Sequence, residues 1–176
     1  IFDRSFSVDV LDLSYNKFET IPTAVQHAAA SLYHINLDHN EIVTLPTWQD
    51  PSGRRSNVVM LKLSGNAIEP PEQNVLSEIS ESLAYLDFSH NQLTTLDIGL
   101  VSSLTKLETL LLAGNPWNCD CDIAWLRALN GLSFTIETDW SYCAGPSDVE
   151  GQMALCYDVS QCNDVEDDVM VLDNIM

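Results

Sequence analysis

Basic residues are scarce in this chain: seven Lys and Arg stand against 26 Asp and Glu among 176 residues, which gives a formal net charge of −19. A field of this sign repels phosphate backbones and anionic lipid headgroups. The composition therefore argues against nucleic acids and membrane surfaces as partners. Apolar residues still make up 45% of the chain, which is enough for a hydrophobic core and excludes wholesale disorder.

Motifs that carry catalysis are absent as well. The sequence has no glycine-rich phosphate loop, H-E-x-x-H helix, G-x-S-x-G elbow or dinucleotide fingerprint. The acidic segment 163–168 lacks the glycine and the alternating ligands of a calcium loop. No apolar run approaches the ~18 to 20 residues that a membrane-spanning helix needs. The sequence therefore predicts a protein that is not an enzyme and that has no cofactor and no bound metal.

Five segments within residues 1–115 share the pattern L-x-x-L-x-L-x-x-N, with other apolar residues at some Leu positions. The pattern ends at Asn16, Asn40, Asn66, Asn91 and Asn115, which are 24, 26, 25 and 24 residues apart. The segments resemble leucine-rich repeats, whose period covers this range. One repeat cannot bury its apolar side alone, so the repeats are expected to stack. The predicted fold is an α/β leucine-rich repeat solenoid with a curved parallel sheet and an irregular convex side.

Alternation along each predicted strand separates core from surface. Leu11 and Leu13 point inward, whereas Val10 and Asp12 point outward. The same pattern in all five strands, with the residues that flank them, predicts a ligand-binding surface on the concave face: Val10, Asp12, Tyr15, His34, Asn36, Asp38, His39, Met60, Lys62, Tyr85, Asp87, His90, Thr109 and Leu111. Aromatic and Met side chains beside acids suit a protein partner with a basic, partly apolar patch. Tyr85 is the expected hot spot, and a merely solvated face is the alternative.

Other repeated positions are expected to be structural. The Asn side chain that ends each repeat can satisfy backbone groups where the chain leaves the sheet. Apolar residues that follow each strand, such as Phe18 and Ile42, are expected to line the convex side. Residues 47–56 are predicted to form an irregular surface loop whose Trp48 offers a second contact site, and residues 72–80 a short helix.

All five cysteines lie within residues 119–176, together with twelve acids and one base. Cys-x-Cys is not the usual spacing of zinc ligands, and no His lies in this region, so disulfides are favoured over a metal site. Disulfides indicate an oxidising compartment. Asp122 is expected to cap a short helix that, with Trp117 and Trp125, covers the last repeat.

The segment N-P-W-x-C-D-C, residues 115–121, is followed by Trp125-Leu126 and later by Cys143 and Pro146. It resembles the cysteine-rich C-terminal flank of extracellular leucine-rich repeat proteins, such as Slit-like proteins and Toll-like receptors. The resemblance implies the pairs Cys119–Cys143 and Cys121–Cys162, with Cys156 as the alternative fourth cysteine. The predicted divisions are repeats over residues 1–115, a cap over 116–162 and an acidic tail over 163–176.

The resemblance and the absent motifs together predict an extracellular recognition module, either a receptor ectodomain fragment or a secreted protein, that binds a protein ligand on its concave face. The alternative is a structural or matrix adhesion protein that assembles with copies of itself. No N-x-S/T sequon is present, so N-glycosylation is not expected. No cysteine precedes Val8, so we expect a missing N-terminal cap and self-association through the uncovered first repeat.

Overall fold

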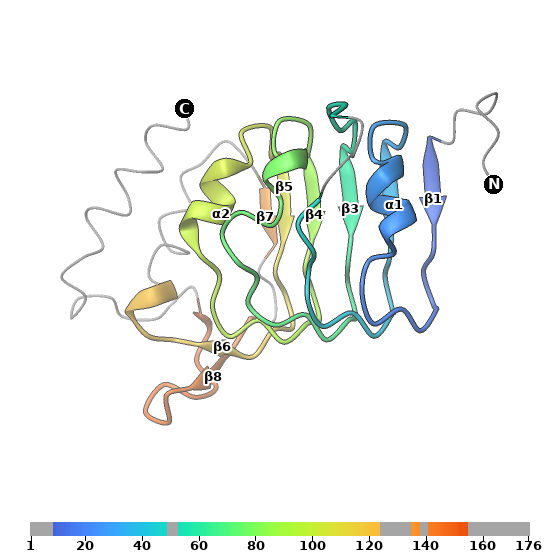
Figure 1. Ribbon diagram of the computed structural model, residues 1–176. Coiled ribbons are helices and arrows are strands. Elements are labelled where there is room, and N and C mark those ends of the chain that lie inside the picture. The colour runs from blue at the N-terminus through green and yellow to red at the C-terminus, as the bar shows by residue number, and fades with distance from the viewer. Residues whose placement is uncertain (1–8, 49–52, 124–134, 138–140, 155–176) are drawn as a thin grey trace.

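The computed structural model describes residues 9–48, 53–123, 135–137 and 141–154. Six short strands lie side by side and run in the same direction (Figure 1). They follow one another in chain order: β1 (Val10–Asp12), β2 (His34–Asn36), β3 (Met60–Lys62), β4 (Tyr85–Asp87), β5 (Thr109–Leu111) and β7 (Thr135–Glu137). Each strand pairs in parallel with the next. The predicted solenoid with a parallel sheet is therefore confirmed.

The central residue of each strand anchors the repeat in the core. Ile35, Leu61, Leu86 and Leu110 are completely buried and lie in register across β2 to β5. Leu11 takes the same position in β1 and is partly buried. Burying one such side chain stabilises the fold by about 1.5–3 kcal/mol. The strands have only three residues each, so stacking of repeats rather than strand length holds the sheet together.

The convex side consists of short helices and irregular chain. It contains α1 (Thr23–Ala28), the 3₁₀-helix η1 (Ser77–Ile79) and α2 (Ile98–Ser103). Asp97 caps α2 by accepting a hydrogen bond from the Gly99 backbone N–H. Of the helix expected over residues 72–80, the structure contains the single 3₁₀ turn η1. The apolar residues expected on this side are buried, with Phe18 partly so: Phe18, Ile21, Ile42, Leu45, Ile68, Leu93 and Leu96.

The beginning of the predicted cap is described. Strands β6 (Trp117–Asn118) and β8 (Cys143–Gly145) pair in parallel, and the 3₁₀-helix η2 spans Cys121–Ile123. A disulfide joins Cys119 to Cys143, with 5.4 Å between their Cα atoms, and Trp117 beside it is completely buried. Cys121 is also disulfide-bonded. The choice between Cys156 and Cys162, the packing of Trp125 and the acidic tail fall outside the described residues.

Candidate recognition surface

We define the concave face as the outward positions of β1 to β5. The strand register aligns the side chains of this face into two columns. The first column is Val10, His34, Met60, Tyr85 and Thr109, and the second is Asp12, Asn36, Lys62, Asp87 and Leu111. The register thus brings together ten of the fourteen predicted contact residues. The other four, Tyr15, Asp38, His39 and His90, follow the strands along one edge of this face.

Exposure differs along the two columns. Val10, Asp12 and His34 are exposed, whereas Met60, Lys62 and Tyr85 are half-buried. The Lys62 Nζ lies 6.0 Å from the centre of the Tyr85 ring, within the range of a cation–π interaction. Lys62 is the one base among these outward positions. The middle of the face therefore offers a half-buried aromatic ring beside a single cation, with acids around them.

Asp87 is less available than the sequence suggests, since only 8% of the residue is exposed. Its Oδ1 accepts hydrogen bonds from the Ser89 backbone N–H at 2.9 Å and from the Ser89 hydroxyl at 2.5 Å. The carboxylate is thus held inside the turn that ends β4. Asp87 contributes negative charge to the concave face but little contact area.

Two other carboxylates on this side have pKa values displaced in opposite directions. Asp12 Oδ1 accepts two hydrogen bonds from Ser14, one from its hydroxyl at 2.6 Å and one from its backbone N–H at 2.9 Å. These bonds lower the pKa of Asp12. Asp38 is partly buried, and this desolvation raises its pKa, although its Oδ1 accepts from the Ser64 backbone N–H at 2.8 Å. The negative charge of Asp38 is therefore only partly compensated by its surroundings.

The residue that precedes each repeat-ending Asn adopts the left-handed conformation. The backbone φ is 55° at Tyr15 and 54° at both His39 and His90, and the equivalent residues of the other two repeats are glycines, with φ of 68° at Gly65 and 70° at Gly114. We call these five positions the turn edge. The Tyr15 and His39 rings stack with 4.5 Å between their centres. Sequence analysis grouped Tyr15, His39 and His90 with the concave face but missed their backbone conformation, for which the two glycines were the available signal.

Four of the five repeat-ending asparagines, Asn40, Asn66, Asn91 and Asn115, form a buried ladder. The Asn91 side chain accepts from the Ile68 backbone N–H at 3.0 Å and donates to the carbonyl oxygens of Leu63 and Phe88 at 2.9 and 3.1 Å. Asn40, Asn66 and Asn115 likewise link their own turn to the preceding repeat. These side chains are therefore committed to the fold and do not belong to the recognition surface.

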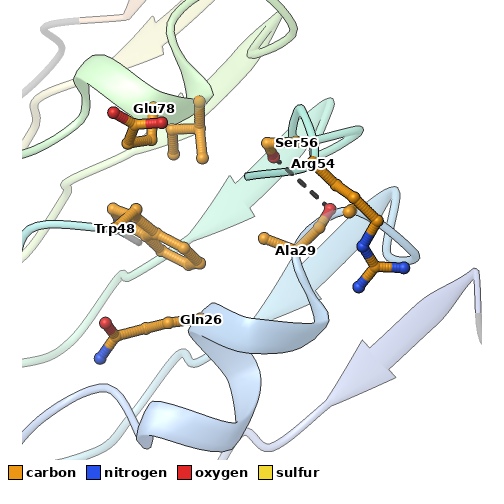
Figure 2. A pocket seen from close by; sticks show the side chains of 8 residues that line it. Gln26, Ala29, Trp48, Arg54, Ser56 and Glu78 are labelled. Carbon is orange, nitrogen blue, oxygen red and sulfur yellow. Dashed lines mark hydrogen bonds between the residues drawn. The ribbon is translucent and has the colours of Figure 1, made fainter. Parts of the chain in front are cut away.

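A small hollow lies on the convex side between α1 and η1. Figure 2 shows the Trp48 indole between Gln26 of α1 and Glu78 of η1. Only 1% of Trp48 is exposed, so the sequence-based suggestion that Trp48 is a surface contact is wrong. Burial of such a large apolar side chain is favourable. Within the described part of the chain, no group of three or more His, Cys, Asp or Glu side chains is arranged to hold a metal ion.

The sequence matches the family model for the Leucine Rich Repeat over residues 7–28 and 82–104. A leucine-rich repeat and fibronectin type III domain-containing protein 1-like protein of Danio rerio is 32% identical over 139 residues, which are 73% of this chain and 19% of that protein. Nephrocan of Mus musculus is 26% identical over 142 residues, 81% of this chain and 26% of that protein. Protein toll of Drosophila melanogaster is 30% identical over 98 residues, 54% of this chain and 8% of that protein.

A similar fold occurs in a solved octameric complex of Latrophilin 3, Unc5D and FLRT2, the last represented by its leucine-rich repeats. The TM-score is 0.64 with 21% sequence identity, over 89% of this chain and 55% of the matched chain. This likeness bears on the fold alone. The chain spans only about a fifth to a quarter of the length of the first two relatives above.

Proposed function

Because the chain is a leucine-rich repeat protein similar to extracellular members of that family, we propose that it is a recognition module that binds a protein ligand on its concave face. The observation that carries this proposal is the alignment of outward side chains in two columns, with Met60 and Tyr85 half-buried at the centre. Partly buried aromatic and Met side chains are enriched at the centres of protein interfaces. The asparagine ladder maintains the frame, which leaves the outward residues available for contact.

Charge supports a basic partner. The concave face and its edge carry Asp12, Asp38 and Asp87 against one base, Lys62, and the whole chain has a net charge of −19. Complementary charge accelerates encounter and disfavours wrong partners. The ligand is therefore proposed to be a protein with a basic, partly apolar patch.

An extracellular location is supported by the Cys119–Cys143 disulfide, which suits an oxidising compartment. Within the described residues, no helix is long and apolar enough to cross a membrane.

Truncation of Tyr85 tests the proposed site. We expect Tyr85→Ala to weaken binding of a protein partner by about 2 kcal/mol, since Tyr at the centre of an interface is a typical hot spot. The matched control is Tyr142→Ala, which removes a 42% exposed Tyr in the cap. The partner would be identified by screening the purified chain against extracellular proteins, and affinities compared by surface plasmon resonance. Equal affinity of Tyr85→Ala and the parent chain would place the site elsewhere.

Self-association is the second candidate function, either as matrix adhesion or by pairing through β1, the edge strand of the described sheet. Val10 in the edge strand β1 is 58% exposed, and Leu11 and Leu13 are only partly buried. An exposed edge strand is a template for pairing with another chain. Sedimentation equilibrium over a hundred-fold range of concentration separates the two candidates: a monomer throughout excludes assembly, and a concentration-dependent dimer that Val10→Lys abolishes supports it.

A further inference from the structure

The turn edge forms a row of flat side chains along the concave face. Backbone hydrogen bonds fix the order of its positions: the Tyr15 N–H donates to Asp38, the His39 N–H to Ser64, the Gly65 N–H to Ser89 and the His90 N–H to Ala113. Each position of the edge therefore lies one repeat away from the next. Tyr15, His39 and His90 are all exposed.

Each imidazole leans toward the following repeat. A Cβ atom added to Gly65 would lie 2.5 Å from His39 Nδ1, and one added to Gly114 would collide with the His90 ring in the same way. The left-handed backbone and the glycine in the next repeat together hold both rings in this orientation. Tyr15 completes the pattern by stacking on His39.

One slot in this row holds no ring: the His39 ring lies over Gly65 and the His90 ring over Gly114, so the slot between them lies over the repeat of His90. Tyr15 and His39 are one repeat apart and their ring centres are 4.5 Å apart. His39 and His90 are two repeats apart, because Gly65, which has no side chain, lies between them. Since parallel strands are about 4.8 Å apart, the two imidazoles are separated by about 10 Å. One flat group placed midway would lie about 5 Å from each ring, which is within stacking distance.

Polar and acidic groups border this gap on the side of His39. Asp38 belongs to the repeat of His39, but its Oδ1 accepts from Ser64 in the next repeat, so the carboxylate reaches to the residue beside Gly65. The hydroxyl oxygens of Ser64 and Ser89 lie 2.9 Å apart and extend the polar surface toward His90. Burial raises the pKa of Asp38, so a cation close to this carboxylate would relieve part of its desolvation cost.

We propose that the gap between His39 and His90 binds the guanidinium group of an arginine from a protein partner, which stacks between the two imidazoles on the side of Asp38. This inference rests on the proposed recognition function and names the side chain that the site selects. Arginine fits because its charged group is planar, stacks on rings and pairs with carboxylates. Lysine carries a compact charge that cannot fill a flat gap in this way.

A small probe tests the gap without a protein partner. The purified chain is titrated with N-acetyl-arginine amide and, separately, with N-acetyl-lysine amide, while the ring signals of the four histidines are followed by NMR. We expect the arginine probe to shift His39 and His90 in a saturable manner, with a dissociation constant at least about five-fold lower than that of the lysine probe. His34, on the same face, and His27, in α1, serve as internal controls and should not saturate.

Variants identify the two components of the gap. His90→Ala removes one wall and Asp38→Asn removes the charge, and each should weaken the arginine probe about two- to five-fold. Their matched controls, His27→Ala and Glu41→Gln, alter an exposed His and an exposed acid outside the gap and should leave binding unchanged. Equal binding of both probes, or equal shifts at His34, would mean general attraction of cations to an acidic protein and would overturn the inference.

The probe titration and the Tyr85→Ala experiment distinguish failure of the gap from failure of the proposed function. If a protein partner is lost on Tyr85→Ala while the arginine probe does not bind, only the gap is wrong. If the probe binds the gap while the partner ignores Tyr85→Ala, the inference about the side chain stands and the proposed site on the concave face fails.

Discussion

Asn91 illustrates how a single side chain can join two repeats. Only 1% of Asn91 is exposed, and its side-chain amide bonds to backbone groups of its own turn and of the preceding repeat. Asn16 holds the same place in the first repeat, but it is exposed, and its partners among the described residues are Leu13 and Ser14 of its own turn. The same residue type therefore contributes differently according to its position in the stack.

Replacement of Asn91 should reveal this difference. Asn91→Ala leaves buried backbone groups without partners, so we expect the free energy of unfolding to fall by about 2–4 kcal/mol. Asn16→Ala, the matched control, should cost less than about 1 kcal/mol because water can replace its partners. Urea unfolding followed by circular dichroism measures both values. Equal losses in the two variants would show that the ladder contributes nothing beyond its own turns.

Asp38 and Asp12 should respond to pH with opposite signs. The pKa of Asp38 is raised by burial, so the folded state binds its proton more tightly than the unfolded state, and the stability linked to this group falls as pH rises through its folded pKa. The pKa of Asp12 is lowered below its ordinary value of 3.8 by the hydrogen bonds from Ser14, so its contribution is present at neutral pH and is lost as the pH falls through the folded pKa. We therefore expect Asp38→Asn to stabilise the chain at pH 7, and Asp12→Asn to destabilise it slightly.

Unfolding in urea at pH 7 and pH 3 measures these effects. At pH 3 Asp38 is protonated in both states, so the difference between Asp38→Asn and the parent chain should disappear. A destabilising Asp38→Asn at pH 7 would contradict the assignment of burial as the dominant cause.

At the scale of secondary-structure elements, the role of Trp48 depends on the helices packed around it. It fastens the loop before β3 against α1 and η1, and its Nε1 has no hydrogen-bond partner among the described residues. The shape of the side chain rather than its polarity should therefore determine which substitutions of Trp48 the fold tolerates. Trp48→Phe should cost about 1 kcal/mol, since it keeps an aromatic ring and loses no hydrogen bond.

Complete truncation of the same side chain should cost much more. We expect Trp48→Ala to lower the free energy of unfolding by about 3–5 kcal/mol, the usual cost of a large cavity. Val43→Ala, at a residue 39% exposed on the chain leading into this loop, should change stability by less than about 0.5 kcal/mol. Thermal and urea unfolding check the order of the three variants. If Trp48→Phe were as damaging as Trp48→Ala, an unidentified acceptor for Nε1 would have to exist.

The strands and their register follow from the sequence because one pattern repeats five times and each repeat has to bury the same positions. Residues with individual environments are harder to predict. Trp48 lies in a polar, turn-rich segment, and only the packing of α1 and η1 shows that it is buried. Asp87 looks like a surface acid, although the shared sequence D-x-S in Asp12-Leu-Ser14 and Asp87-Phe-Ser89 indicates a local hydrogen bond.

At the scale of the whole molecule, different parts of the chain stabilise the fold in different ways. The core and the asparagine ladder stabilise the stack, and the Cys119–Cys143 disulfide links the two strands β6 and β8. The repeat pattern leaves the outward residues of the concave face unconstrained. Binding of a protein on this face is the central claim of the account.

A glycan wedge tests this claim most directly. The chain has no native N-x-S/T sequon, and Lys62→Asn creates one with Ser64 at the centre of the concave face, whereas Arg54→Asn creates one with Ser56 on the convex side. Both variants would be secreted from mammalian cells, checked for occupancy by mass spectrometry, and compared with the parent chain for binding to the identified partner. The account predicts that the glycan on the Lys62→Asn chain abolishes binding and that the glycan on the Arg54→Asn chain does not. Full binding by the glycosylated Lys62→Asn chain would contradict it.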